Sequence, residues 1–355
     1  MTDPQERALV WLAASGFDHR ECALLLRAAG SPKRLYDEFE KILPTVIQRE
    51  DCGVYKSDRS CRERELNALL AEMEEKEYFA VTLLSDDYPE ALKAIPTPPI
   101  VLFGKGNRAL LKQRKFALVG SRLTPPWAES KGKEVAKRLS RSFAIVTGIA
   151  EGGDSAAIEG AYPSGNLIAV LPCGLNECYP AAHAALKEKI AKKGLLLTEY
   201  PPKEKLRKYY FHARNRILAG LAEGVLVISA GVKSGALITA NRALEYGREV
   251  YAFPYSLGAS QGAGCNELIK SGAYLATGAE DILSDFGISV APEEEAELDE
   301  GERRVLTVLR EKGETHLTVI AQEAGLPVFE AMAVLSALEI KNLAVKAGGN
   351  RYAAL

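Results

Sequence analysis

The sequence lacks several features that would place it in common classes of protein. No apolar run approaches the ~18–20 residues of a membrane-spanning helix. The N-terminus carries Asp3, Glu6 and Arg7, where a secretion signal would need a basic start and an apolar run. The six cysteines include no C-x-x-C pair, and the four histidines complete no zinc-binding pattern. These absences predict a cytoplasmic protein with reduced thiols and neither a metal nor another cofactor.

The net charge is also small, and it conceals an uneven distribution. The 355 residues are 47% hydrophobic and 26% charged, a mixture that can bury the cores of two or three domains. The net charge of −2 divides into −4 for residues 1–110, +7 for 111–291 and −5 for 292–355. The central segment is therefore cationic and would attract a polyanion, whatever the sum for the chain.

The spacing of apolar residues predicts a helical segment followed by an α/β domain. Residues 1–80 carry apolar residues at helical spacing, and a proline-rich connector leads to a short strand at 100–103. Six further strands are expected at Phe116–Val119, Phe143–Val146, Leu167–Leu171, Leu195–Thr198, Val225–Ile228 and Val250–Phe253. Because continuous apolar strands alternate with amphipathic stretches, the fold class is α/β, a doubly wound Rossmann-like parallel sheet.

The last segment predicts a linker and a small C-terminal domain. An acidic run at 293–302 is typical of a solvated linker. Helix, helix, turn, helix, strand and a glycine tip then follow within about 55 residues, the order of a winged helix. A winged helix can bind DNA, but the acidity of this one favours protein contact. The expected domains are a helical one at 1–80, the α/β domain at 81–290 and the linker with the winged helix at 291–355.

The densest basic stretch is Lys203–Arg216, which surrounds Tyr209, Tyr210 and Phe211. Cations that track phosphates, with aromatic faces that stack on bases, are what sequence-tolerant binding of single strands requires. A solvated loop anchored to the core by its aromatic residues would explain the same composition. Both readings stay open at this point.

Two glycine-rich turns follow predicted strands, at 120–122 and 147–154, where phosphates are often held. Neither reads G-x-G-x-x-G, so a dinucleotide cofactor is not expected. Lys233-Ser234-Gly235 lacks the glycine of a P-loop before its lysine, so nucleoside triphosphate hydrolysis is not supported either. Backbone N–H groups at these turns could bind anions, although tight packing of strands against helices would also explain the glycines.

Several motifs in one order carry a family resemblance. They are Gly120-Ser121-Arg122, Thr147-Gly148 through Asp154-Ser155-Ala156-Ala157, Phe211 through Arg214-Asn215-Arg216, Ser234-Gly235-Ala236-Leu237-Ile238-Thr239-Ala240, Gly247-Arg248-Glu249-Val250 and Gly264-Cys265-Asn266-Glu267-Leu268-Ile269 with Gly272-Ala273. Together they resemble the DNA-processing protein A (Smf) family over roughly residues 80–285. The helical N-terminal region resembles the sterile-alpha-motif-like domain often found in that family, and the winged helix also fits.

The resemblance implies a non-enzymatic, homodimeric protein that binds single-stranded DNA. Such a protein shields incoming strands and loads a RecA-type recombinase during natural transformation. Arg122 would contact phosphate. The path of the DNA strand would be lined by Lys208, Phe211, Arg214 and Arg216. The pocket would be shaped by Asn215, Ser234 and Gly235. The DNA-binding residues implied in this way are Gly120, Ser121, Arg122, Gly148, Lys208, Phe211, Arg214, Asn215, Arg216, Ser234 and Gly235.

The chain departs from the family pattern at six positions, namely Glu151, Gly153, Ile158, His212, Ser229 and Tyr255. Glu151 is the most consequential departure, because it would place a negative charge where DNA phosphate passes. Two other functions remain alternatives. A Rossmann-like nucleotide phosphoribohydrolase of the lysine-decarboxylase-like type would need a P-G-G-x-G-T-x-x-E run, and residues 230–236 lack the spacing of its glutamate. A protein-interaction scaffold that has lost DNA binding is the other.

Overall fold

The computed structural model describes residues 2–47, 59–289, 298–341 and 343–354. It divides into two compact units, Met1–Ile288 and Ser289–Leu355, which are described separately. Residues 293–297 of the predicted acidic linker lie outside the described ranges. The helical N-terminal region and the α/β domain, which the sequence separates at residue 80, belong to the same unit.

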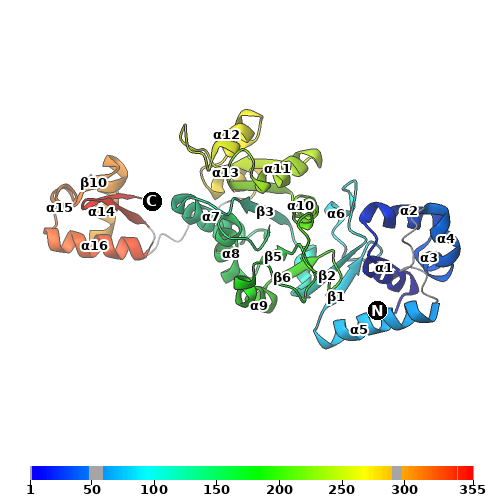
Figure 1. Ribbon diagram of the computed structural model, residues 1–355. Coiled ribbons are helices and arrows are strands. Elements are labelled where there is room, and N and C mark those ends of the chain that lie inside the picture. The colour runs from blue at the N-terminus through cyan, green and yellow to red at the C-terminus, as the bar shows by residue number, and fades with distance from the viewer. Residues whose placement is uncertain (1, 48–58, 290–297, 342, 355) are drawn as a thin grey trace. The chain divides into compact units, whose positions relative to one another are not determined.

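A nine-stranded sheet forms the centre of the first unit (Figure 1). Its strands are β1 (Phe79–Thr82), β2 (Val101–Gly106), β3 (Lys115–Gly120), β4 (Ala144–Thr147), β5 (Leu167–Val170), β6 (Leu195–Thr198), β7 (Gly224–Ser229), β8 (Glu249–Ala252) and β9 (Tyr274–Leu275). All six strands expected in the α/β domain are present, and most are fully buried because helices cover both faces. The doubly wound α/β fold is therefore confirmed.

The strand order β1-β2-β6-β5-β4-β3-β7-β8-β9 fixes where a ligand would bind. From β6 to β9 all neighbours are parallel, whereas β1 and β2 add an antiparallel edge. The chain runs outward from β3 in one direction through β4, β5 and β6, and then returns to place β7 on the other side of β3. The crevice at the carboxyl ends of β3 and β7 is therefore a topological switch point, where open α/β sheets bind their ligands.

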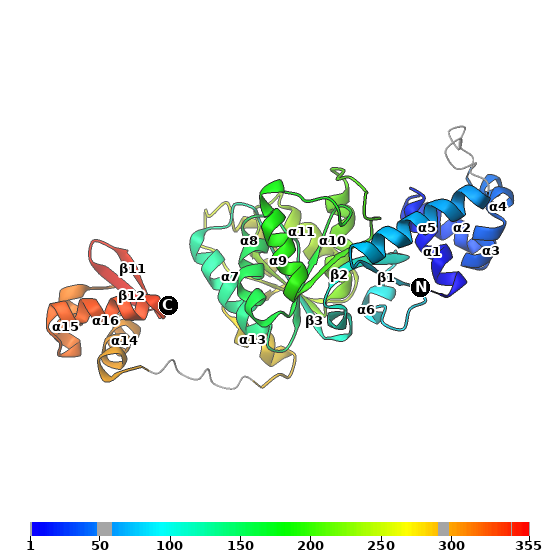
Figure 2. The same cartoon turned by 90° about the horizontal axis from the view of Figure 1, so that it is seen from below.

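Two helical layers cover this sheet (Figure 2). One layer contains α7 (Pro126–Leu139), α8 (Gly153–Ala161), α9 (Ala184–Lys193) and α13 (Ala279–Asp285). The other contains α6 (Glu90–Lys93), α10 (Tyr210–Leu221), α11 (Gly235–Glu245) and α12 (Ala263–Lys270). The described part of the chain also contains the short 3-10 helices η2 (Arg108–Lys112), η3 (Tyr162–Ser164) and η4 (Ala181–His183). Successive residues of each strand face opposite sides of the sheet and so pack against different helical layers. Val119 and Val227 face the layer that contains α10 and α11.

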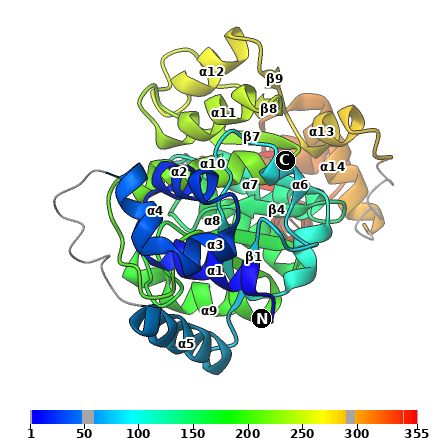
Figure 3. The same ribbon diagram turned by 90° about the vertical axis from the view of Figure 1, so that its right-hand side faces the viewer.

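The N-terminal region is helical, as the apolar spacing predicts (Figure 3). It contains α1 (Pro4–Ala14), α2 (His19–Ala29), α3 (Pro32–Asp37), α4 (Phe39–Val46) and α5 (Arg59–Glu75). Asp18 caps α2 in a capping box with Glu21, which satisfies amide groups that the helix leaves free. The guanidinium of Arg62 lies 5.8 Å from the ring centre of Trp11 and 5.6 Å from that of Phe39, at the centre of this region.

The second unit is the expected winged helix. It contains α14 (Glu300–Lys312), β10 (Thr315–His316), α15 (Leu317–Ala324), α16 (Val328–Ile340), β11 (Ala344–Gly348) and β12 (Arg351–Ala354). Its sheet has the order β10-β12-β11 and packs with the three helices around a separate apolar core. Within the described ranges, no single helix is long and apolar enough to cross a membrane, although α15 and α16 together pass that test as a pair bent by 101°.

Candidate functional site

The turns after β3 and β7 are joined at the switch point. The backbone N–H of Ser121 donates to the carbonyl oxygen of Ser229 over 2.9 Å. The hydroxyl of Ser229 lies 2.6 Å from that of Thr124, and both side chains are buried. These bonds fix the turn that carries Arg122, so the backbone of this exposed arginine is held in place.

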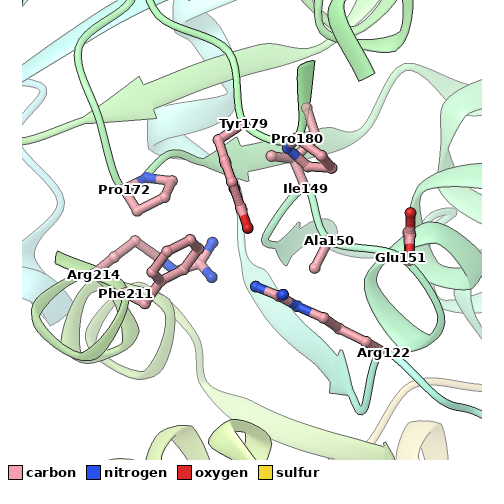
Figure 4. Close-up of a pocket in the computed structure, with 9 residues that line it drawn as sticks. All are labelled: Arg122, Ile149, Ala150, Glu151, Pro172, Tyr179, Pro180, Phe211 and Arg214. Carbon is pink, nitrogen blue, oxygen red and sulfur yellow. The ribbon is translucent and has the colours of Figure 1, made fainter. Parts of the chain in front are cut away.

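A pocket of about 130 Å³ opens beside this turn (Figure 4). Its lining comes from four connections: the turn after β3, the turn after β4, the loop after β5 and the first turns of α10. The lining residues are Arg122, Ile149, Ala150, Glu151, Pro172, Tyr179, Pro180, Phe211 and Arg214. Three of the residues predicted for the site, Arg122, Phe211 and Arg214, therefore meet at one pocket.

The guanidinium of Arg122 lies against two aromatic rings that also contact each other. Its guanidinium carbon is 5.7 Å from the ring centre of Phe211 and 5.9 Å from that of Tyr179. The two rings are 5.5 Å apart and nearly perpendicular, at 71°. Each cation–π contact stabilises the guanidinium only weakly at an exposed position, by about 0.5–1 kcal/mol. The arrangement therefore orients an exposed positive charge beside two ring systems and leaves that charge available to an anion.

Arg214 forms the inner wall of the pocket, where it is almost completely buried. Its Nη1 donates to the carbonyl oxygen of Val170 over 2.7 Å, and its Nε donates to Oδ1 of Asn215 over 3.1 Å. Burial raises the pKa of Asp154 and lowers that of Arg214, and the attraction between the two groups opposes both shifts. Arg214 is therefore a fixed cation held by the protein, unlike the exposed Arg122.

Close packing accounts for the glycines of the two turns. A Cβ atom on Gly148 would lie 2.2 Å from Oδ2 of Asp154 and 2.5 Å from Nη1 of Arg214. A Cβ atom on Gly120 would lie 2.7 Å from the Cα atom of Gly153, where α8 begins. The packing explanation for these glycines thus has direct support, and it does not conflict with anion binding at the same edge of the sheet.

The remaining predicted residues lie around the pocket rather than in its lining. Nδ2 of Asn215 donates to the carbonyl oxygen of Gly235 over 3.2 Å, and Ser234 caps the N-terminus of α11. These residues join the start of α11 to α10. Lys208 is exposed in the loop just before α10.

Arg216 does not lie in the wall of the pocket, although it was expected to line the path of a bound DNA strand. Its side chain is buried and forms an ion pair with Glu199. Burial lowers the pKa of the His19 imidazole in α2, and the charge of nearby Arg216 lowers it further. Arg216 follows Arg214 by two positions on α10, so the turn of the helix carries its side chain away from the pocket. Its guanidinium faces Glu199 instead of the pocket.

The departures from the family pattern lie in different environments. Glu151 lines the pocket, but its carboxylate is turned away from the guanidinium of Arg122 (Figure 4). Ile158 is buried in α8, whereas His212 is exposed on α10. Ser229 supplies the hydrogen bonds at the switch point. The hydroxyl of Tyr255 donates to the carbonyl oxygen of Ile228 over 2.9 Å, which supports the end of β7.

The sequence did not point to one wall of the pocket, formed by Pro172, Tyr179 and Pro180. A signal was available, because these residues follow β5, and the carboxyl ends of parallel strands meet at one edge of a sheet. The loop after β5 contains Gly174 but neither of the two motifs that drew attention to the turns after β3 and β4. Within the described ranges, no group of three or more His, Cys, Asp and Glu side chains is arranged to hold a metal ion.

Comparison with known proteins gives two matches to family models. The model of DNA recombination-mediator protein A matches residues 79–287. The model of the DprA winged helix domain matches residues 289–350. The first match covers the whole sheet and the pocket, and the second covers most of the second unit.

Curated proteins match as well. The DNA processing protein DprA of Streptococcus pneumoniae is 42% identical over 212 residues, 59% of this chain and 75% of that protein. Protein Smf of Escherichia coli is 35% identical over 310 residues, 83% of each chain.

Two solved structures are similar. The X-ray structure of DprA from Streptococcus pneumoniae has a TM-score of 0.64 at 32% identity and covers 81% of this chain and 99% of that one. A structure of DprA from Helicobacter pylori, described for its single-stranded DNA binding mode, has a TM-score of 0.54 at 30% identity. That comparison covers 59% of this chain and 95% of the other.

Proposed function

This chain belongs to the DNA recombination-mediator protein A family, and from that premise we propose that its pocket binds single-stranded DNA. The observation that carries the proposal is the position of Arg122 against the rings of both Phe211 and Tyr179. A guanidinium presents a planar, permanently charged fork to a phosphate. Each ring offers a face on which a base can stack, independently of its sequence.

This chemistry favours a single strand over a duplex. In a duplex each base already stacks on its neighbours, so an aromatic side chain gains a base only by separating the stack. In a single strand the bases are free to turn toward Phe211 and Tyr179 while the phosphates follow the cations. No arrangement of side chains for reading base edges is needed, so the binding would tolerate any sequence.

The basic loop before α10 would extend the site beyond the pocket. Lys205, Arg207 and Lys208 are exposed there, next to the half-exposed ring of Tyr209. Arg207 pairs with Glu204 over 3.3 Å, so Lys208 is the cation of this group nearest to α10 for which no ion pair is found among the described residues. A DNA strand that continues from Phe211 along this loop would bring a phosphate to the positive charge of Lys208.

The finer role that we propose follows from this binding. A protein that holds a single strand through its phosphates and bases covers the groups that nucleases attack and keeps the strand extended. It would thereby shield incoming DNA and present it to a RecA-type recombinase in natural transformation. It would act by binding, without a covalent step.

A homodimer is part of the same proposal. Strand β9 is one edge of the sheet and, among the described strands, pairs with β8 alone; its Tyr274 and Leu275 are half exposed. An edge with free backbone groups and apolar side chains is a natural contact for a second copy. Sedimentation of the full chain at micromolar concentration measures whether its mass is that of two chains.

The experiment that tests DNA binding is the double substitution Arg122→Ala with Lys208→Ala. The variant should lose most of its retention of a labelled single-stranded oligonucleotide in a filter assay at moderate salt. A matched control removes one arginine and one lysine elsewhere, in Arg141→Ala with Lys192→Ala. Both control residues are exposed and precede β4 and β6, so they lie near the amino ends of the strands. If both double variants bind equally well, the assignment of the site is wrong.

A further inference from the structure

Helix α16 of the second unit is apolar on two opposite faces. Ala331, Leu335 and Leu338 are completely buried in the core of the unit. On the other side, the exposed fractions are 69% for Phe329 and 83% for Ile340. A helix that is apolar all round is normally covered on every side. One face of α16 therefore lacks the cover that its composition predicts, within the described part of the chain.

The exposed residues form one continuous stripe. The α16 stripe consists of Phe329, Met332, Ala333, Ser336 and Ile340, all of which are exposed. Their offsets from Phe329 are 3, 4, 7 and 11 positions, which keeps them on one side of a helix for three turns. Isolated exposed apolar residues need no explanation, but a contiguous stripe marks a surface for contact with another molecule.

The charges around the stripe exclude nucleic acid as its occupant. Helix α16 contains Glu330 and Glu339 but neither lysine nor arginine. From residue 292 to the end the chain has 7 basic and 12 acidic residues. Four of these basic residues already form ion pairs, and they are Arg304, Lys312, Lys341 and Arg351. A helix that entered a DNA groove here would bring carboxylates toward phosphate.

The flanking charges instead select a basic partner. Glu330 and Glu339 lie on opposite sides of the stripe, about 100° and −80° from Phe329 at ~100° per residue. Neither forms an ion pair with a described residue. A second copy of α16 would bring the same carboxylates together, in either orientation of two packed helices. An anionic lipid surface would be repelled in the same way.

We propose that the α16 stripe docks an amphipathic helix of a partner protein, whose apolar face is bordered by lysine or arginine. Three turns of helix match the length that a helical segment offers to a groove or to another helix, through anchors at i, i+3, i+4 and i+7. Pairing with Glu330 and Glu339 then sets the orientation and the choice of partner. The winged helix is accordingly a protein-recruiting module, and this role is independent of DNA binding at the pocket.

The test uses the full chain and a fluorescent peptide of 18 residues, with leucines on one helical face and lysines beside them. Fluorescence anisotropy should show binding, and Phe329→Ser with Ile340→Ser should weaken it at least tenfold. Both side chains are exposed, so the variant should keep its fold, which circular dichroism verifies. The control Leu24→Ser with Leu257→Ser removes two exposed apolar residues elsewhere and should leave the affinity unchanged.

A charge swap makes the test specific. In Glu330→Lys with Glu339→Lys, the preference should reverse toward a peptide that has glutamates in place of the lysines. Equal affinity of the wild type for both peptides would overturn the proposal, and so would unchanged binding by the serine variant. Loss of self-association in the serine variant would identify a second copy as the occupant. Binding to phosphatidylcholine vesicles that the serine variant loses would identify a membrane.

Discussion

Two helices of this protein, α10 and α16, hold positions in their folds from which a helix can contact nucleic acid, but their surroundings differ in charge. Helix α10 follows a basic loop and brings Phe211 and Arg214 to a pocket that also contains Arg122. Helix α16 occupies the third-helix position of a winged helix and carries no lysine or arginine. The comparison shows that the fold of a module does not decide its ligand, whereas the charges and side chains at its surface do.

The difference extends to how each surface is built. The pocket on α10 rests on buried polar groups, among them Arg214 and Asp154, and on Gly148, which leaves room for both side chains. The α16 stripe rests on an ordinary apolar core and needs no special backbone. The first surface should therefore be sensitive to small changes beneath it, and the second should tolerate them. The predictions below test this contrast, starting with the largest expected effect.

Substitution of Gly148 by alanine should damage the first surface most. The added Cβ atom would overlap Oδ2 of Asp154 and Nη1 of Arg214, so that these buried groups or the turn after β4 must shift. Overpacking costs about 1–3 kcal/mol. We expect the free energy of unfolding to fall by about 3 kcal/mol, the upper end of that range, because both displaced groups are buried and polar; denaturation in urea measures the loss.

The matched control is Gly235→Ala at the start of α11. A Cβ atom there would meet nothing within 4 Å, and alanine is a better helix former than glycine. The free energy of unfolding should change by less than about 0.5 kcal/mol. Equal losses at Gly148 and Gly235 would show that the packing of Asp154 and Arg214 does not depend on the space left by Gly148.

Substitution of Phe211 by alanine should weaken DNA binding while leaving its salt dependence unchanged. Loss of one stacked base costs about 1–3 kcal/mol, which corresponds to a roughly 5- to 150-fold weaker affinity for a single strand. Because the ring carries no charge, the slope of log K against log salt should stay the same. Lys208→Ala should instead reduce that slope by about 0.7, the value for one phosphate contact on a single strand.

A salt titration of both variants by fluorescence anisotropy separates the two effects. Phe211→Leu serves as a control for packing, because it keeps an apolar side chain but removes the aromatic face. If leucine restores full affinity, then Phe211 supports the pocket without stacking on a base. A reduced slope for Phe211→Ala would show that the ring positions a cation that contacts phosphate.

Glu72 lies on α5, at the boundary of the acidic N-terminal helices. It should make a smaller, pH-dependent contribution to the free energy of unfolding. Partial burial opposes its ionisation, but hydrogen bonds from Lys76, Asn176 and Lys203 outweigh this and lower its pKa to about 2. A lowered pKa stabilises the fold above the ordinary value near 4.5, and this contribution is lost as the pH falls toward 2. Because solvent screens these surface pairs, Glu72→Gln should cost only about 1 kcal/mol at pH 7.

Urea denaturation at several pH values measures this cost. The difference between Glu72→Gln and the wild type should shrink between pH 4.5 and pH 2. Glu90→Gln is the control, since its side chain is 85% exposed and lies 3.8 Å from Lys93, and it should have almost no effect at any pH. A difference that is constant with pH would mean that Glu72 acts through packing and not through its charge.

The sequence predicted the fold far better than the site. Continuous apolar runs marked β3 to β8 because both faces of a parallel sheet are buried, which leaves a strong local signal. The short edge strand β9 carries no such run and was not anticipated. At the site, motif order brought Arg122 and Phe211 to one pocket. It could not show that Arg216 pairs with Glu199, because the partner lies 17 positions away in the sequence and is chosen by the packing of α10.

The smallest expected effect concerns the wing of the second unit. Lys346 and Arg351 flank the tip between β11 and β12, the position from which a winged helix can contact DNA beside its recognition helix. Arg351 is paired with Glu314 over 2.7 Å, and Lys346 lies over the ring of Tyr352. Since α16 offers no cation to hold DNA near this wing, replacing both residues by alanine should change the affinity for a single strand less than twofold. A loss as large as that of Arg122→Ala with Lys208→Ala would place the wing in the DNA site and remove the contrast between the two units.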